Sequence, residues 1–407
     1  MSAEVKNGYK LTEVGVIPED WEVRRIGELK PFITSGSRGW AEFYSDRGAP
    51  FIRITNLVRT SIFLDLKDLR LVNLPKDASE GTRTQLHDDD VLISITADIG
   101  IISYVSPDVP KPAYINQHIA LVRFDASTIS PKFVAYFLAS DKPQKLFRAL
   151  TDSGAKAGMS LITVQNILLA FPPTKAEQAA ISEALSDADA LIESLEKLIT
   201  KKRQIKQGAM QELLTGKKRL PGFSGEWEVK KLGDVAEVIM GQSPTSINYN
   251  TKGTGLPLIQ GNADIVDRQT IIRVFTSDVT RNGKCGDILM SVRAPVGEVS
   301  RAVFDVCLGR GVCAIRSANH FIYHYLIAQE PSWARLSKGS TFDSVNSADV
   351  KAFAIYLPVD SKEQSAIAEI LMDMDSEIEV LEVKLVKARK IKHGIMHNLL
   401  TGKIRVS

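Results

Sequence analysis

The chain has 407 residues, of which 44% are hydrophobic and 24% charged, and its net charge is only +3. This composition fits a globular protein of about two to four domains and excludes a uniformly basic nucleic-acid coat. Three cysteines without CxxC spacing exclude a disulfide framework and a structural zinc site, and indicate reduced thiols in the cytoplasm. No run reaches the roughly 18 apolar residues of a membrane helix, and Met1–Lys10 lacks the apolar core of a secretory signal.

An internal repeat dominates the sequence. The paired segments are Trp21–Glu28 with Trp227–Asp234, Asp90–Ser94 with Asp287–Ser291, and Glu177–Lys217 with Glu363–Lys403. The offset between the copies is 206 residues at the first pair, 197 at the second and 186 throughout the third. Loops tolerate changes of length and packed helices do not, so the chain is two copies of a variable globular unit, each followed by a rigid unit.

Short β-rich runs between turn residues fill both globular units, with few helices. In the first unit we predict strands at Pro50–Val58, Val91–Ile95 and Ile119–Phe124, and a helix at Pro131–Ala139. The second unit has predicted strands at Leu256–Gln260 and Val312–Ile315, and a helix at Phe321–Ala328. The sequence does not define how these strands are ordered.

Each rigid unit is predicted to be one long helix of roughly 60 Å. Apolar residues recur at alternating steps of three and four, which is the seam of a coiled coil. The seam residues are Leu185, Ile192, Leu195 and Ile199 in the first helix, Leu371, Ile378, Leu381 and Leu385 in the second, and the series continues to Ile205 and Ile391. Because the copies imply a pseudo-two-fold relation, the two helices are expected to pair with each other, antiparallel.

Capping signals mark both ends of these helices. Thr174 with Glu177, and Ser361 with Gln364, have the spacing of a capping box, and Gly216 and Gly402 stand where a C-terminal cap belongs.

Basic residues gather near the C-terminal end of each helix, at Lys201–Lys206 and Lys387–Lys392. They either form a solvated face that complements the helix dipole or contact phosphates or an acidic partner. Lys202 falls at a seam position that Ala388 occupies in the other copy. It either fixes the register of the helices or, as we favour, extends its ammonium group to solvent.

The predicted fold is therefore α+β, with two α/β domains separated by two long helices in an antiparallel coiled coil. The boundaries are 1–172 for the first globular domain, 173–216 for the first helical region, 217–358 for the second domain and 359–407 for the second helical region.

Enzyme signatures are missing from the sequence. It has no GxxxxGK[ST] phosphate loop, no GxGxxG after a strand, no HExxH and no GxSxG elbow. Phe171–Thr174 resembles an amino-methyltransferase box only superficially and is interpreted as a turn leading into a helix. His118 lacks a nucleophile at a suggestive spacing and is expected to be a structural or hydrogen-bonding histidine. No catalytic residue and no metal ligand is assigned.

Polar and aromatic loop residues are suited to reading DNA bases. Arg and Gln bond base edges through two atoms at once, Ser bonds phosphates, and glycine lets the backbone approach closely. The candidates are Ser37, Arg38, Trp40, Tyr44, Arg53, Asn56 and Gln117 in the first copy, and Gln242, Ser243, Tyr249, Gln260, Asn262, Arg293 and Arg310 in the second. Each of them alternatively serves only to hold its loop together.

Several stretches resemble the specificity subunits (HsdS) of type I restriction–modification systems, and the resemblance spans nearly all of the chain. They are Tyr9–Trp21 with Ile26–Glu28, Pro257–Ile265, Ser291–Gly297, Gly309–Gly311 and the two segments that run from Glu-Gln to Leu-Leu-Thr-Gly-Lys. The first copy departs from the second, since Thr96–Gly100 stands where Arg293–Gly297 stands. Base-contacting roles therefore do not transfer between the copies, and two different half-sites are expected.

The resemblance implies a target recognition domain in each globular unit, reading one half of a split double-stranded DNA sequence, with the helix pair fixing the spacer. It implies two methyltransferase (HsdM) subunits and restriction (HsdR) subunits as partners. S-adenosylmethionine, ATP and Mg²⁺ would be bound by those partners and not by this chain. The alternatives are a coiled-coil scaffold that does not read DNA, and a nuclease or methyltransferase that carries its own recognition domains.

Overall fold

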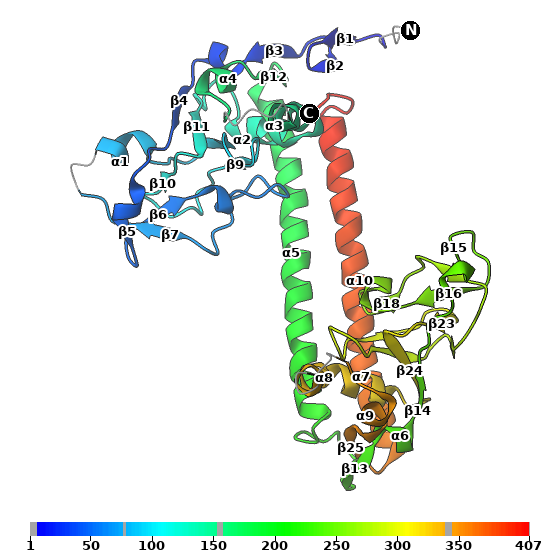
Figure 1. The fold of residues 1–407 in the computed structure, drawn as a ribbon. Coiled ribbons are helices and arrows are strands. Elements are labelled where there is room, and N and C mark those ends of the chain that lie inside the picture. The colour runs from blue at the N-terminus through cyan, green and yellow to red at the C-terminus, as the bar shows by residue number, and fades with distance from the viewer. Residues whose placement is uncertain (1–5, 76–78, 153–157, 338–343, 407) are drawn as a thin grey trace. The chain divides into compact units, whose positions relative to one another are not determined.

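The structure is a computed structural model that describes residues 6–75, 79–152, 158–337 and 344–406. Its contacts divide the chain into two compact units, of which the first comprises residues 1–196 and 384–407 and the second residues 197–383. Each unit contains one globular domain, the N-terminal part of one long helix and the C-terminal part of the other (Figure 1). The division therefore cuts through both long helices instead of separating them from the globular domains.

The described part of unit 1 holds two four-stranded sheets. One has the antiparallel order β4 (Phe32–Ser35), β11 (Ile119–Arg123), β8 (Val91–Ser94), β9 (Ile102–Tyr104). The other has the order β10 (Tyr114–Ile115), β6 (Ala49–Ile52), β7 (Arg70–Val72), β5 (Tyr44–Ser45), with β10 parallel to β6. Two smaller pairs are β1 (Tyr9–Thr12) with β2 (Gly15–Pro18), and β3 (Glu22–Arg25) with β12 (Leu168–Phe171). The helices are α1 (Ser79–Thr84), α2 (Pro131–Ala139), α3 (Asp141–Asp152) and α4 (Leu161–Gln165), with 3₁₀ turns η1 (Ile26–Leu29), η2 (Trp40–Phe43) and η3 (Ile54–Asn56).

Unit 2 repeats this plan with larger sheets. One has the order β14 (Glu237–Met240), β24 (Val312–Arg316), β21 (Ile288–Ser291), β22 (Val299–Arg301), β18 (Gln269–Thr270), β17 (Ile265–Val266). The other has the order β15 (Tyr249–Asn250), β19 (Phe275–Thr276), β16 (Leu256–Ile259), β23 (Val306–Leu308), β20 (Asn282–Gly283), and β13 (Trp227–Lys231) pairs with β25 (Ala354–Pro358). The helices are α6 (Leu232–Val235), α7 (His320–Ala328), α8 (Glu330–Ser337) and α9 (Ser347–Ala352), with η4 (Ser246–Asn248) and η5 (Asn262–Asp264).

A fully buried central strand organises each globular domain. In β8, Val91 and Ile93 join the apolar cluster that contains α2, while Leu92 joins the cluster of the second sheet. In β21, Ile288 and Met290 likewise join the apolar cluster that contains α7, while Leu289 joins the cluster of the other sheet. A strand buried on both faces reads as a continuous apolar run, which is why these two runs are the clearest strand signals in the sequence.

The predicted strands are present but shorter than some of the runs. The run Pro50–Val58 contains only β6, because the chain turns into η3 at Ile54. The predicted helix Pro131–Ala139 is α2, and Phe321–Ala328 is α7, which begins one residue earlier. Phe171 ends β12, and residues 172–174 form the turn that leads into the first long helix, as predicted.

The long helices are α5 (Lys175–Leu213) and α10 (Ser361–Leu399), each of 39 residues. Thr174 Oγ1 accepts the amide proton of Glu177 at 3.3 Å, which is one half of the predicted capping box. The second predicted box is wrong, because Ser361 is already helical and Asp360 accepts the amide proton of Lys362 at 2.8 Å. Gly216 and Gly402 have φ values of +69° and +66°, the left-handed conformation of a C-terminal cap.

Ion pairs fix the register of the two helices, and each pair occurs twice at the 186-residue offset. Unit 1 contains Lys392–Asp189, Arg389–Glu196 and Arg405–Glu177, and unit 2 contains Lys206–Asp375, Arg203–Glu382 and Arg219–Glu363. Within each unit, residues of higher number on one helix pair with residues of lower number on the other, as Asp189 with Lys392 and Glu196 with Arg389. The helices therefore run antiparallel, as predicted. Most of the basic residues near the helix C-termini thus bind acidic residues of the opposite helix, and Lys202 is not free in solvent but pairs with Glu377 at 2.7 Å.

The eight predicted seam residues are buried or half-buried. Ile205 and Ile391, which continue the apolar series, are 47% and 50% exposed and lie outside the seam. At these turns it is Lys206 and Lys392 that face the opposite helix, where they form ion pairs with Asp375 and Asp189. These ion pairs replace the apolar contact that Ile205 and Ile391 were expected to make.

The repeated Glu-Gln dipeptide joins helix, domain and tail. Glu177 forms two hydrogen bonds with Arg405, while the Gln178 side chain accepts the amide proton of Ser130 and donates to the carbonyl of Pro172. Glu363 and Gln364 make the corresponding bonds to Arg219 and to Pro358 and Asn319. The helix start is thereby bound both to its own globular domain and to the segment that follows the other helix.

We predict that Asp189→Asn lowers the free energy of unfolding by about 3 kcal/mol, because it leaves the ammonium group of Lys392, which is 11% exposed, without its anion. Asp189 also accepts the hydroxyl proton of Tyr136 at 2.7 Å. The matched control is Asp187→Asn, two positions away and exposed, which should stay within about 0.5 kcal/mol of the parent. Urea denaturation followed by far-ultraviolet circular dichroism checks this, and equal losses in the two variants would contradict the pairing.

His324 takes the place of Tyr136 in the second copy. It is fully buried, neither ring nitrogen has a hydrogen-bond partner among the described residues, and Nδ1 lies 4.0 Å from Asp375 Oδ2. Burial, together with the positive charges of Lys206 and Arg301, lowers the pKa of His324 to about 3.

This histidine makes the stability of unit 2 depend on pH. Its unfolded pKa of about 6.5 lies above its folded pKa, so its contribution is complete above pH 6.5 and is lost as the pH falls toward 3. We predict that His324→Tyr removes up to about 1.4 kcal/mol per pH unit of this acid sensitivity. Urea denaturation between pH 7 and 5 measures the slope. The exposed His393→Tyr should keep the parent slope, and a parent slope in His324→Tyr would refute the prediction.

Candidate nucleic-acid interface

The Gly309-Arg310-Gly311 turn lies where the ends of several strands meet. Gly309 N donates to Ile259 O at 2.7 Å, and Val292 N donates to Gly311 O at 2.9 Å. A Cβ atom on Gly311 would lie 2.0 Å from the carbonyl oxygen of Gln260. In the second copy this close approach to Gln260 requires glycine at position 311, on a turn where the ends of β16, β21 and β23 converge.

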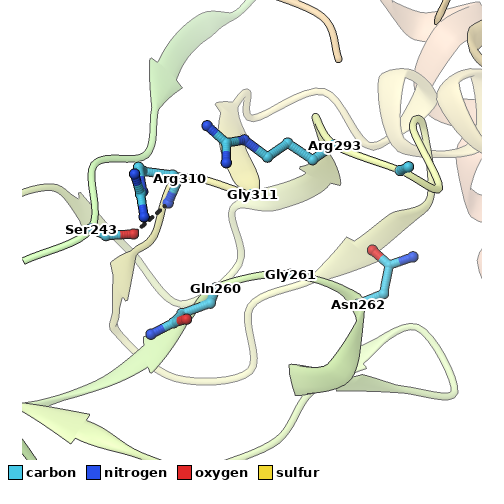
Figure 2. Close-up of a pocket in the computed structure, with 8 residues that line it drawn as sticks. Ser243, Gln260, Gly261, Asn262, Arg293, Arg310 and Gly311 are labelled. Atoms are coloured by element: carbon cyan, nitrogen blue, oxygen red, sulfur yellow. Dashed lines mark hydrogen bonds between the residues drawn. The ribbon is translucent and has the colours of Figure 1, made fainter. Parts of the chain in front are cut away.

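A cavity of about 210 Å³ opens at this turn. Its lining residues are Ser243, Gln260, Gly261, Asn262, Arg293, Ala294, Arg310 and Gly311 (Figure 2). We call it the arginine pocket. Arg310 N donates to Ser243 Oγ at 3.0 Å, and the Asn262 side chain donates to Glu298, so these two polar side chains are held in place.

The two arginines of the arginine pocket keep their guanidinium groups available. Both side chains are exposed, and neither guanidinium has a hydrogen-bond or ion-pair partner within the described ranges. Figure 2 shows the Arg293 side chain extending across the pocket toward Arg310. The pocket therefore presents two cations beside the amide groups of Gln260 and Asn262.

The first copy has a cavity of about 220 Å³ at the corresponding turn. Its lining residues are Gly39, Trp40, Ala41, Tyr44, Phe51, Asn116, Gln117 and His118. We call it the glutamine pocket. His118 Nδ1 bonds the hydroxyl group of Thr96, and its Nε2 lies 3.1 Å from Gln117 Nε2, so His118 is the hydrogen-bonding histidine that the sequence predicts.

The same backbone hydrogen bonds hold both turns. Asn116 N donates to Ile52 O at 3.1 Å, as Gly309 N does to Ile259 O, and Ile95 N donates to His118 O at 2.9 Å, as Val292 N does to Gly311 O. Gln117 therefore occupies the position of Arg310, at the offset of 193 residues that relates β11 to β24.

The loop after the buried strand is also the same in both copies. Ser94 Oγ accepts from Ile101 N and donates to Asp98 O, and Ser291 Oγ accepts from Glu298 N and donates to Pro295 O, all at an offset of 197 residues. Thr96 thus stands at the position of Arg293. The backbone scaffold is duplicated, and the side chains on it differ.

Some of the predicted base-contacting residues line the two pockets, and the others lie elsewhere. The predicted residues that line the two pockets are Trp40, Tyr44, Gln117, Ser243, Gln260, Asn262, Arg293 and Arg310. Outside the lining, Arg38 and Gln242 are exposed and Ser37 is half-buried. Tyr249 is half-buried and donates its hydroxyl proton to Pro244 O, and Arg53 binds Asp68.

Trp40 and Asn56 are removed from this set. Trp40 is 3% exposed and stacks on Phe51 at 4.8 Å between ring centroids, so it belongs to the apolar cluster beneath the glutamine pocket. Asn56 is 2% exposed, and its amide group bonds the backbone of Arg53, Asp65 and Asp68. Both side chains serve the fold, since Asn56 is buried with its amide group bonded and Trp40 is a nearly buried part of the glutamine-pocket wall.

The sequence reasoning missed other residues near the pockets. Glu298 orients Asn262, and the Arg70 guanidinium lies over the ring of Tyr44, 5.2 Å from its centroid. His118, which the sequence identified only as a structural or hydrogen-bonding histidine, also lines the glutamine pocket. Nothing in the sequence indicates Arg70, because it comes from a strand far from Tyr44 along the chain.

Other chemistry is not assembled in the part of the chain that the structure describes. It contains no group of three or more His, Cys, Asp or Glu side chains placed to hold a metal ion. Among the helices described, none combines the length and the apolar character that crossing a bilayer requires. Burial raises the pKa of the Cys313 thiol to about 12, which keeps this thiol protonated.

Comparison with known proteins finds one family. The sequence profile of the type I restriction modification DNA specificity domain matches twice, at residues 18–207 and 224–388. A Methanocaldococcus jannaschii protein described as "Putative type I restriction enzyme MjaX specificity subunit" is 32% identical, with 98% of this chain and 97% of that protein covered. The MjaVIII specificity subunit of the same organism is 23% identical, over 96% and 94%.

Two solved structures share the fold. The type I restriction–modification S subunit from M. genitalium has a TM-score of 0.66 at 14% identity, with 97% of each chain covered. A chain from a study of complex assembly and conformational transition in a type I system has a TM-score of 0.56 at 22% identity, covering 95% of this chain and 99% of that one.

We predict that Gly311→Ala lowers the free energy of unfolding by about 2 kcal/mol, because its Cβ atom would press against the backbone of Gln260. The matched control is Gly261→Ala in the same pocket, where no atom lies within 4 Å of the added Cβ and the backbone is extended. Urea denaturation compares the two variants. Equal stability would show that the strand ends do not need glycine at 311.

Proposed function

The chain belongs to the type I restriction–modification DNA specificity subunits, and from this premise we propose that the arginine pocket and the glutamine pocket each read one half of a bipartite DNA target. The observation that supports this is the duplicated turn, which holds Arg310 and Gln117 at equivalent backbone positions with different chemistry around them. Different side chains on the same backbone suit the reading of two different half-sites. The proposal therefore expects an asymmetric target.

The charge of the chain limits how it binds. Sequence-independent affinity comes mainly from phosphate contacts by Lys and Arg, and a net charge of +3 supplies few of them. We infer that this chain alone binds DNA weakly and that partner subunits supply most of the phosphate contacts. Exposed guanidinium and amide groups in the two pockets supply direct contacts to base edges.

The paired helices are proposed to set the spacer between the half-sites and to dock two methyltransferase (HsdM) subunits. Apolar side chains remain exposed on the helices in both units, at Leu191, Val386 and Ile391 in the first, and at Leu198, Ile205, Val380 and Val383 in the second. These exposed apolar side chains are the ones on the helices that a docked subunit would cover. Half-sites about one duplex turn apart, roughly 34 Å, would present the same side of the DNA to both domains.

We assign no catalysis to this chain. In the proposed assembly the methyltransferase subunits bind S-adenosylmethionine and flip the target adenine, and restriction (HsdR) subunits supply chemistry that depends on ATP and Mg²⁺. A scaffold that does not read DNA, and an enzyme with its own recognition domains, are both disfavoured by the match of the specificity family along both copies.

The experiment that tests the proposal is a base-modification map of a host genome in which the chain is co-expressed with its cognate methyltransferase subunit. We expect methylated adenines in a split, asymmetric motif with a fixed spacer. Replacing the residues before Pro172 with the first domain of another specificity subunit should change one half-site only. An assembled complex that adds no methylation, or a swap that changes both halves, would refute the proposal.

A further inference from the structure

The two pockets differ most in cationic charge. At the two equivalent positions, the second copy has Arg310 and Arg293 where the first has Gln117 and Thr96. We propose that the arginine pocket reads guanine, so that the half-site of the second domain contains at least one G·C pair recognised through Arg293 and Arg310. This inference rests on the proposed function, since it names the base that one of the proposed reading sites selects.

Arg310 is held by its backbone and free at its tip. Gly309 N and Arg310 N are both bonded to neighbouring segments, at Ile259 O and Ser243 Oγ, and Gly311 O accepts from Val292 N. The guanidinium is exposed, and no described residue binds it. A side chain on a fixed turn loses less conformational freedom on binding than one on a mobile loop, which favours a specific contact over a diffuse one.

Arg293 approaches the same opening from another loop. Val292 is bonded on both sides, donating to Gly311 O at 2.9 Å and accepting from Val345 N at 3.0 Å. Its neighbour Arg293 then projects over the pocket toward Arg310 (Figure 2). Two guanidinium groups from two fixed loops thus converge on one opening.

The chemistry of a guanidinium selects guanine among the bases. It has five N–H donors and no acceptor, and guanine presents two adjacent acceptors, O6 and N7, in the major groove. Adenine presents an amino group next to N7, which would place donor against donor. Cytosine presents a donor, and thymine presents one acceptor beside a methyl group.

Phosphate is the other partner that arginine prefers, and the surroundings of the arginine pocket disfavour it. Glu298 lies behind the pocket lining, where its carboxylate accepts a hydrogen bond from Asn262. A fixed carboxylate repels a phosphate but tolerates a neutral base edge. The amide groups of Gln260 and Asn262, which carry both donors and acceptors, are also suited to base edges.

The test uses the complete complex with its methyltransferase subunits and the motif mapped from the methylated genome. The variants are Arg310→Gln and Arg293→Thr, which install the residues of the first copy. The control is Arg281→Gln, which removes the same charge from an exposed residue outside the pocket lining. We expect each pocket variant to lose its preference for G·C at one position in one half of the motif. Methylation of sites with G·C at that position should fall by roughly 5- to 150-fold. The other half and the control should match the parent.

A second measurement changes the DNA base and not only the protein. Parent and Arg310→Gln complexes are titrated with duplexes in which 7-deazaguanine replaces one guanine at a time, since this base lacks the N7 acceptor but still pairs with cytosine. We expect one position to weaken parent binding by roughly tenfold and to leave the variant unaffected, because the contact is already lost there.

Three results would overturn the inference. They are a second half-site without guanine, pocket variants that weaken every sequence equally and so act on phosphates, and 7-deazaguanine that has no effect at any position. A parent complex that assembles and methylates nothing would instead refute the proposed function, and the two failures are therefore distinguishable.

Discussion

Opposite charges on two antiparallel helices set the geometry on which the rest of the protein depends. The acidic residues lie toward the N-terminal end of each helix and the basic residues toward the C-terminal end and beyond it, so only an antiparallel alignment brings them together. Lys392 with Asp189 and Lys206 with Asp375 show this in the two units, at equivalent positions. Because the same pairs form twice, one register satisfies both units, and a shift along the seam would break all of them at once.

The globular domains are fastened to this frame at the same points. Glu177 and Gln178 bind a tail arginine, the turn before the helix and the start of α2, and Glu363 and Gln364 do the equivalent in unit 2. Beyond that anchor, each domain brings strand ends together at one turn, where glycines permit contact between backbones. The side chains that differ between the two copies stand on this turn, so in the proposed function recognition would change while the support stays the same. This separation of a fixed frame from exchangeable side chains is what a specificity subunit requires.

Much of the fold could be predicted because its strongest signals are local or repeated. Buried strands such as Val91–Ser94 stand out as continuous apolar runs, and the constant 186-residue offset identifies the rigid helices. The helix partners were also predictable, since Asp189 and Lys392 recur as Asp375 and Lys206. The course of the seam was not, because Ile205 fits the apolar spacing while ion pairs turn its face outward.

The candidate site was predictable only in part. Arg310 and Arg293 stand in glycine- and proline-marked loops, which is a local signal. Trp40 and Asn56 have the same local character, yet tertiary packing buries them, and no pattern in the sequence reports that burial. The equivalence of Gln117 with Arg310 is visible in the repeat, since each stands two residues before the matching strand, β11 or β24, and the backbone hydrogen bonds confirm it.

The most direct test of the frame is to lengthen it and measure the spacer of the DNA target. Three heptads would be inserted between Glu196 and Lys197 and again between Val383 and Lys384, where the two units meet along each helix. These 21 residues add roughly 31 Å of helix, equivalent to about nine base pairs and close to one duplex turn. With the helix content verified by circular dichroism, we predict a methylated motif with unchanged half-sites and a spacer longer by about nine base pairs. A folded variant that methylates the original motif with its original spacer would contradict the account.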